Sequence, residues 1–223
     1  MNNLVKQVAN IFKINGDEAN AKQMSRYLKN KFEFYGLKQA YRAELQKPFL
    51  TKEVLPPLND ITNVVNACWA HPKRELQYFG LDFLVKYLKQ MTPDHLLYFE
   101  GLVQEKSWWD TVDYISTRLS GELLKRFPEN IEHFGERWIN HENLWVNRMG
   151  ILFQLKYKEN TNEALLFKGC LMHANSKEFF IQKVIGWTLR EYGKTKPNIV
   201  EQFIENNDFA PLSVREGLRI IRK

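Results

Sequence analysis

Apolar residues recur three or four positions apart along almost the whole chain, and this spacing most limits the possible fold. Phe79, Phe83, Leu84 and Tyr87 give one clear example. Such a period places apolar side chains on one face of a helix, whereas a half-buried strand alternates apolar and polar residues. Alternating stretches of that kind are hard to find. We therefore predict an all-α fold of short helices without a sheet.

Prolines fall between the helical stretches, several of them where a helix begins and their fixed φ is best tolerated. Asp17 is a suitable N-cap for a helix that we predict over Ala19–Phe32. Neither a low-complexity tract nor a long linker interrupts the sequence. We therefore predict one domain over residues 1–223.

A weak internal repeat of 35 residues runs through the chain. Its windows share their apolar framing, and the equivalent positions hold Tyr78, Asp113, Arg148 and Lys183. A period in the mid-thirties to forties, together with helical content, is typical of a solenoid of helix pairs. Equivalent positions of successive repeats lie side by side in such an array. Asp113, Arg148 and Lys183 are therefore predicted to be neighbours.

The chain has 32 Lys and Arg against 26 Asp and Glu, which gives a formal net charge of +6. This surplus favours an anionic partner (nucleic acid, a phosphorylated surface or a membrane surface), although it also fits plain solubility. No apolar run is long enough for a membrane span, and the N-terminus lacks a signal-peptide core. Two cysteines exclude a disulfide framework and favour a reducing compartment. We predict a soluble, cytoplasmic protein.

The motifs of several enzyme classes are missing. The five histidines are dispersed, with neither an HxxxH pair nor a CxxC motif, so we predict no metal site. The glycines are scattered singly, which excludes the phosphate-binding loops, and a serine nucleophile elbow is absent. The sequence therefore gives no motif support for a kinase, a dehydrogenase or a serine hydrolase, and we predict no cofactor.

Two stretches carry unusual combinations of side chains. Trp109 and Asp113 lie four residues apart and share one face of a helix, for which Ser107 is a suitable N-cap. Alternatively, Trp109 belongs to the core and Asp113 is solvated or forms a structural salt bridge, with Arg148 as the candidate partner. The second stretch is a stripe of one helix that combines three basic residues with a tryptophan. Its members are Lys183, Trp187, Arg190 and Lys194.

A basic stripe that contains an aromatic residue is the pattern of a surface that follows a phosphate backbone. The alternative is a charged helix face that covers a core tryptophan.

The tryptophan-rich stretch around Asp113 resembles the signature of the AlkD-type DNA alkylation repair glycosylase family. Further segments resemble this family in the same order along the chain. The matching segments are residues 24–30, 106–113, 148–158, 176–187 and 212–216. The resemblance implies a right-handed solenoid of HEAT-like antiparallel helix pairs, whose concave basic face holds duplex DNA. We expect the chain to act as a monomer.

The resemblance also implies a monofunctional glycosylase of base excision repair. Such an enzyme hydrolyses the N-glycosidic bond of cationic N3- and N7-alkylated purines and leaves the lesion stacked in the duplex. Asp113 would be the catalytic carboxylate, and Trp109 and Trp187 would flank the sugar. The implied DNA-contacting residues are Tyr27, Arg148, Lys156, Lys183, Arg190 and Lys194. Ala40 stands where the family often has a proline, in a segment on which catalysis should not depend.

The main alternative is a non-catalytic helical-repeat scaffold that binds nucleic acid or protein. Solenoids mostly bind, and a fold alone does not imply an enzyme. The set of Trp109, Asp113 and Trp187 distinguishes the two hypotheses, because a scaffold has no reason to keep these three side chains together. A protein-interaction module would instead have an apolar concave face.

Overall fold

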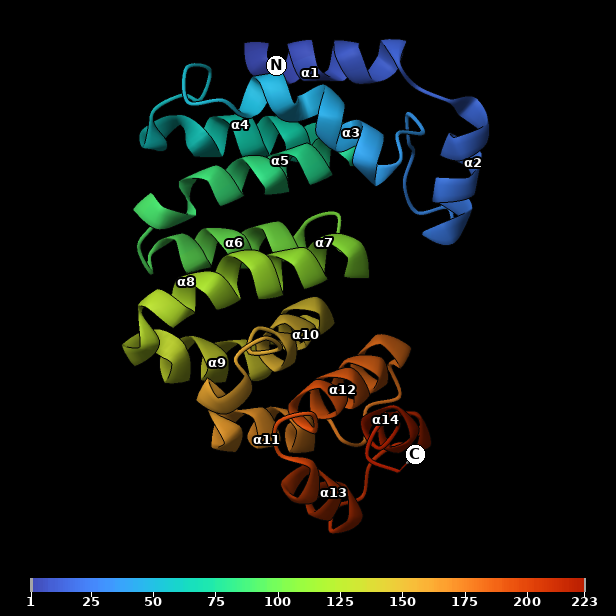
Figure 1. Cartoon of the computed structure of the whole chain (residues 1–223), viewed down its shortest axis with the longest axis vertical. Coiled ribbons are helices and arrows are strands. Elements are labelled where there is room, and N and C mark those ends of the chain that lie inside the picture. The colour runs from blue at the N-terminus through green and yellow to red at the C-terminus, as the bar shows by residue number, and fades with distance from the viewer. Residues whose placement is uncertain (1, 223) are drawn as a thin grey trace. The chain divides into compact units, whose positions relative to one another are not determined.

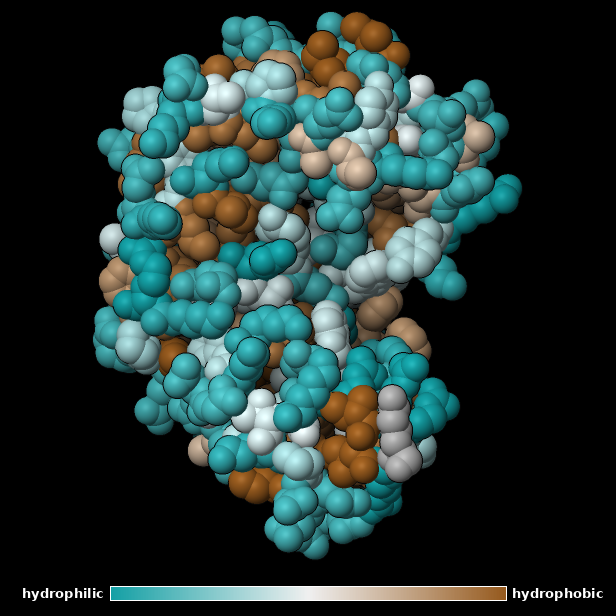
Figure 2. All heavy atoms as spheres, viewed as in Figure 1, coloured by the Kyte–Doolittle hydropathy of each residue, from teal (hydrophilic) through white to brown (hydrophobic). Residues whose placement is uncertain are grey.

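The computed structural model describes residues 2–222, and the regular structure of these residues is helical (Figure 1). Their only β-type pairing is an isolated bridge between Glu33 and Lys73. This confirms the all-α prediction. No helix within the described range is both long and apolar enough to span a membrane. Hydrophilic side chains cover most of the face drawn in Figure 2.

The helices form two compact units, of which the first ends at Gln90 and the second begins at Met91. The single domain, the solenoid and its basic concave face stay predictions. The first unit contains α1 (Asn3–Ile14), α2 (Glu18–Tyr27), α3 (Gln39–Gln46), α4 (Ile61–Ala70) and α5 (Arg74–Tyr87), with 3₁₀ turns at Lys47–Leu50, Leu58–Asp60 and Leu88–Gln90. The apolar face predicted from Phe79 to Tyr87 is buried in its core.

Asp17 caps α2, as predicted, because its carboxylate accepts a hydrogen bond from the Asn20 N–H at 2.6 Å. The predicted extent of that helix was wrong, since α2 ends at Tyr27 rather than Phe32. The backbone leaves helical geometry soon afterwards, and Lys29 and Asn30 both have positive φ.

The segment before α3 is held by a fully buried carboxylate. Glu75 accepts hydrogen bonds from the backbone N–H groups of Tyr35, Gly36 and Leu37. Gly36 has φ +95°, and a Cβ there would lie 1.9 Å from a backbone oxygen, so only glycine fits. Ala40 is the second residue of α3. The first turn of a helix also tolerates proline, so the exchange leaves this helix start intact.

The second unit contains the candidate site. Its helices are α6 (His95–Gln104), α7 (Trp109–Tyr114), α8 (Gly121–Arg126), α9 (Ile131–Ile139), α10 (Leu144–Leu152), α11 (Glu163–Met172), α12 (Phe179–Tyr192), α13 (Pro197–Glu205) and α14 (Pro211–Gly217). A π-helical stretch, Ile115–Ser120, joins α7 to α8, and 3₁₀ turns occupy Pro128–Asn130 and Lys158–Asn160. Helix α10 packs against α7, α9 and α12, and α12 packs against α14.

The 35-residue period is visible in the hydrogen bonds of three helices. Gln77, Asn147 and Gln182 lie one or two periods apart, and each donates its side-chain amide to the carbonyl six residues earlier. The acceptors are His71, His141 and Ser176. These bonds fix the turns that precede α5, α10 and α12. Val112 occupies the remaining equivalent position and has no group to form such a bond.

Candidate functional site

An arginine and a carboxylate from equivalent repeat positions form a two-pronged ion pair. Arg148 of α10 donates from Nε and Nη2 to the two carboxylate oxygens of Asp113 on α7, at 2.7 and 2.9 Å. Its Nη1 donates to the backbone oxygen of Phe180 on α12 at 2.6 Å. The predicted pairing of Asp113 with Arg148 is therefore confirmed, and the guanidinium ties three helices together.

The two partners of this pair differ in exposure. The side chain of Arg148 is 5% exposed, whereas that of Asp113 is 16% exposed. A carboxylate has about four lone-pair sites, and the two bonds from Arg148 leave further acceptor capacity. Arg148 is the more buried partner and fixes the orientation of the carboxylate, which suits a supporting role better than a direct contact with DNA.

Burial raises the pKa of Asp113 above the usual value for an aspartate. The hydrogen bonds and the positive charge of Arg148 oppose this effect, and the nearby charge of Asp110 adds to it. The carboxylate is therefore less stable as an anion than an exposed aspartate, and Arg148 keeps the anionic form accessible.

The two predicted indoles are partly exposed. Trp109 is the first residue of α7 and lies one turn before Asp113 on the same helix face. Trp187 lies two turns after Phe180 on α12 and packs against the apolar core of the C-terminal helices. A fully buried core role is thus excluded for both, although Trp187 also contributes to packing.

The predicted N-cap of the Asp113 helix was wrong. Helix α7 begins after Trp108, which makes no side-chain capping bond. The Ser107 hydroxyl instead donates to the backbone oxygen of Val103 at 2.7 Å. Ser107 therefore closes the end of α6 and does not start α7.

An aromatic cluster beside the ion pair was not singled out from the sequence. Trp108, Trp145 and Phe180 lie at the starts of α7, α10 and α12, with ring centroids 5.0–5.5 Å apart. The guanidinium carbon of Arg148 lies 6.0 Å from the centroid of the Phe180 ring. The repeat relates two members of the cluster, because Trp145 and Phe180 are 35 residues apart, whereas Trp108 lies outside this register.

The predicted phosphate-binding cations are bridged by glutamates. Glu216 of α14 contacts Lys183 at 3.0 Å and Arg190 at 2.5 Å, an arrangement named here the Glu216 bridge. The hydrogen bond from Lys183 lowers the pKa of Glu216; burial opposes it, and the bond and charge of Arg190 lower the pKa further. The stripe on α12 is therefore partly neutralised by its own chain.

A second bridge lies at the end of α12. Glu191 contacts Lys156 at 3.0 Å and Lys194 at 2.5 Å, and this set is the Glu191 bridge. Burial acts to raise the pKa of Glu191, but the hydrogen bonds and charges of both lysines lower it overall. Among the remaining predicted DNA contacts, Tyr27 ends α2 in the first unit and is 70% exposed.

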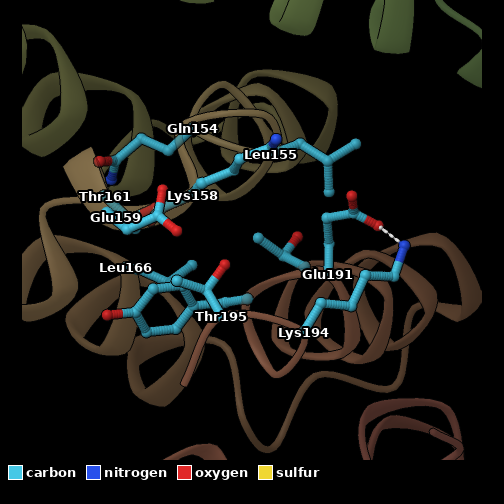
Figure 3. Close-up of a pocket in the computed structure, with 11 residues that line it drawn as sticks. Gln154, Leu155, Lys158, Glu159, Thr161, Leu166, Glu191, Lys194 and Thr195 are labelled. Atoms are coloured by element: carbon cyan, nitrogen blue, oxygen red, sulfur yellow. Dashed lines mark hydrogen bonds and ion pairs between the residues drawn. The ribbon is translucent and has the colours of Figure 1, made fainter. Parts of the chain in front are cut away.

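Glu191 and Lys194 also line a cleft of about 410 Å³ (Figure 3). Its opposite wall comes from the segment after α10, including Gln154 and Glu159. The cleft does not include Asp113 or either predicted indole. Among residues 2–222, no group of three or more His, Cys, Asp or Glu side chains is placed to hold a metal ion.

Two comparisons with known proteins point to the same family. A family model described as DNA alkylation repair enzyme matches residues 9–221. A solved structure described as a predicted DNA alkylation repair enzyme from Enterococcus faecalis is 31% identical in sequence, with a TM-score of 0.89. The match covers 93% of this chain and 97% of that chain. None of the curated proteins compared with the sequence matches it.

Proposed function

Because this chain belongs to the DNA alkylation repair enzyme family, we propose that it is a DNA glycosylase for cationic N3- and N7-alkylated purines in duplex DNA. One observation carries the proposal. Asp113 is the more exposed member of its ion pair, while its arginine is buried behind it. A purely structural pair has no need to leave its carboxylate the more accessible partner.

The reaction needs little acid catalysis. Alkylation at N3 or N7 gives the purine a positive charge, so the base leaves as a neutral molecule. The bond between C1′ and the base nitrogen breaks, and its electron pair goes to the base. Water then adds to C1′ of the oxocarbenium-like sugar and loses a proton. One carboxylate therefore suffices, whereas ordinary glycosidases need an acid and a second carboxylate.

In this proposal the anion of Asp113 faces the sugar. It stabilises the positive charge that develops at C1′ and orients the attacking water. The negative charge of Asp113 is preorganised, because Arg148 binds both carboxylate oxygens and is itself held by the backbone oxygen of Phe180. Arg148 thereby acts as a positioning residue.

Trp109 and Trp187 would present their ring faces to the same sugar. An aromatic face attracts a cation by about 0.5–2 kcal/mol. A site built on the surfaces of α7 and α12 also suits a lesion that stays stacked, because neither tryptophan nor Asp113 belongs to the cleft of Figure 3. The chain would act as a cytoplasmic monomer, and Tyr27 and the four bridged cations would contact the DNA backbone.

The decisive experiment measures release of 7-methylguanine from methylated duplex DNA by the purified chain. We expect Asp113→Asn to keep the fold and to slow single-turnover release by about 10²–10³-fold, the usual effect of losing one preorganised electrostatic group. A circular-dichroism melt and a DNA-binding assay serve as controls. Unchanged release by Asp113→Asn would reject Asp113 as the catalytic group. No release by the unaltered chain would leave the scaffold hypothesis.

A further inference from the structure

The Glu216 bridge depends on close packing between two helices. Lys183 and Arg190 are seven residues apart on one face of α12, and Gly186 lies between them. A Cβ at Gly186 would lie 2.5 Å from the Cβ of Glu216 and 2.9 Å from the backbone oxygen of Ser213. Only a glycine at this position lets α14 come close enough to set its carboxylate between the two cations.

The Glu191 bridge has a different construction. Glu191 and Lys194 are three residues apart at the end of α12, and Lys156 reaches them from the segment after α10. The two bridges share no residue and draw their partners from different parts of the unit. Two independent sets of residues along the α12 stripe therefore place one carboxylate between two cations.

In each bridge, the glutamate cancels half of the positive charge of the two cations. Two cations and one carboxylate leave a single positive charge per bridge. The cations still have donors to offer, because each contacts its glutamate through one nitrogen, while an ammonium has three donors and a guanidinium has five. A phosphate can therefore bind to these side chains, but it approaches them against the charge of a neighbouring carboxylate.

We infer that Glu191 and Glu216 lower the affinity for undamaged duplex, by partly neutralising the four cations that would contact its backbone. This inference rests on the proposed function, since it assigns the stripe to DNA. A repair enzyme meets undamaged DNA far more often than lesions, so it must dissociate from it readily. Both glutamates act through the cations that they hold.

The test compares Glu191→Gln and Glu216→Gln with a matched control. Glu136→Gln removes the same charge from the second unit, but Glu136 pairs with Lys168, outside both bridges. Binding of a short unmodified duplex is measured by fluorescence anisotropy over a series of salt concentrations. Each bridge variant should bind about fivefold tighter than the control, the size expected from one exposed charge interaction. The salt dependence should steepen by up to about 0.9 for each additional phosphate that the freed cations neutralise.

Excision separates this inference from the proposed function. Excess undamaged duplex should slow multiple turnover of the bridge variants more than that of Glu136→Gln, because each bridge variant leaves undamaged DNA more slowly. Binding equal to that of Glu136→Gln, or weaker, overturns the inference even if the unaltered chain is an active glycosylase. If Glu216→Gln loosens α14, Glu191→Gln decides alone, because its bridge does not involve that helix. Tighter binding without any base release supports the bridges and rejects the glycosylase.

Discussion

Two arginine–carboxylate pairs in the second unit share the same chemistry but differ in which partner is the more exposed. Arg137 donates from Nε and Nη2 to Glu100, both at 2.7 Å, just as Arg148 donates to Asp113. In the Glu100 pair the carboxylate is 6% exposed and the arginine 46% exposed. In the Asp113 pair the arginine is the buried partner. The arginine is thus largely exposed in the Glu100 pair, whereas in the Asp113 pair both partners are mostly buried and the carboxylate is the more exposed of the two.

The pKa values of the two carboxylates shift in opposite directions. Burial acts to raise the pKa of Glu100, but the bonds and charge of Arg137, with a hydrogen bond from Trp138, lower it overall. For Asp113, burial outweighs Arg148 and the pKa is raised. Glu100 is a satisfied anion that stabilises the fold. The anion of Asp113 is less favoured than that of an exposed aspartate, and shifted carboxylates of this kind are common at functional sites.

The largest expected difference between the pairs concerns excision. Arg148→Met removes the two bonds that orient Asp113, and we expect single-turnover release of 7-methylguanine to fall about 10–100-fold, as for loss of hydrogen bonds to a charged group. Arg137→Met should leave release unchanged, because Glu100 plays no part in the proposed reaction.

A double variant shows whether Arg148 acts through Asp113. In the Asp113→Asn background, Arg148→Met should cause little further loss, since the carboxylate that it positions is already gone. A full additional loss in that background would mean that Arg148 contacts DNA independently.

The expected difference in stability runs in the opposite direction. The folded pKa of Glu100 is lowered, so its stabilising effect is present above the unfolded pKa and is lost as pH falls through the folded pKa. Glu100→Gln should therefore lower the free energy of unfolding at neutral pH by about 1.5–3 kcal/mol. Asp113→Asn should cost less, because the raised pKa means that folding already favours an uncharged group there. Urea denaturation checks both, and an equal loss would contradict the comparison.

The sequence correctly predicted features that depend on local pattern or on the 35-residue period. Helical spacing predicted the all-α fold, and Asp17 was a correct cap because capping needs only neighbouring residues. The 35-residue period correctly predicted that Asp113 lies beside Arg148. The same period also relates Trp145 to Phe180, which are 35 residues apart and lie together in the aromatic cluster.

Features that arise from tertiary packing were beyond the sequence pattern. Glu216 is 33 residues from Lys183, and it meets the stripe only because Gly186 allows α14 to approach. Ser107 satisfied the local rule for a cap, but the carbonyl of Val103 competed for its hydroxyl. Which partner of an ion pair faces solvent is likewise a property of how whole helices pack.

The smallest expected effect is a shift in the pH dependence of base release. If the anion of Asp113 is the active form, the rate of base release falls as pH drops through the pKa of this group, and that fall occurs at higher pH than for an ordinary aspartate. Asp110 contributes to the raised pKa, so Asp110→Asn should move the acid limb of the single-turnover profile to lower pH. Arg148→Met should move it to higher pH, because it removes the group that favours the anion. As a control, Glu100→Gln should leave the acid limb at the same pH. The release rate measured with Asp113→Asn is subtracted at each pH to correct for spontaneous base loss. If neither Asp110→Asn nor Arg148→Met moves the acid limb, the titrating group is not Asp113, and the active anion is another residue.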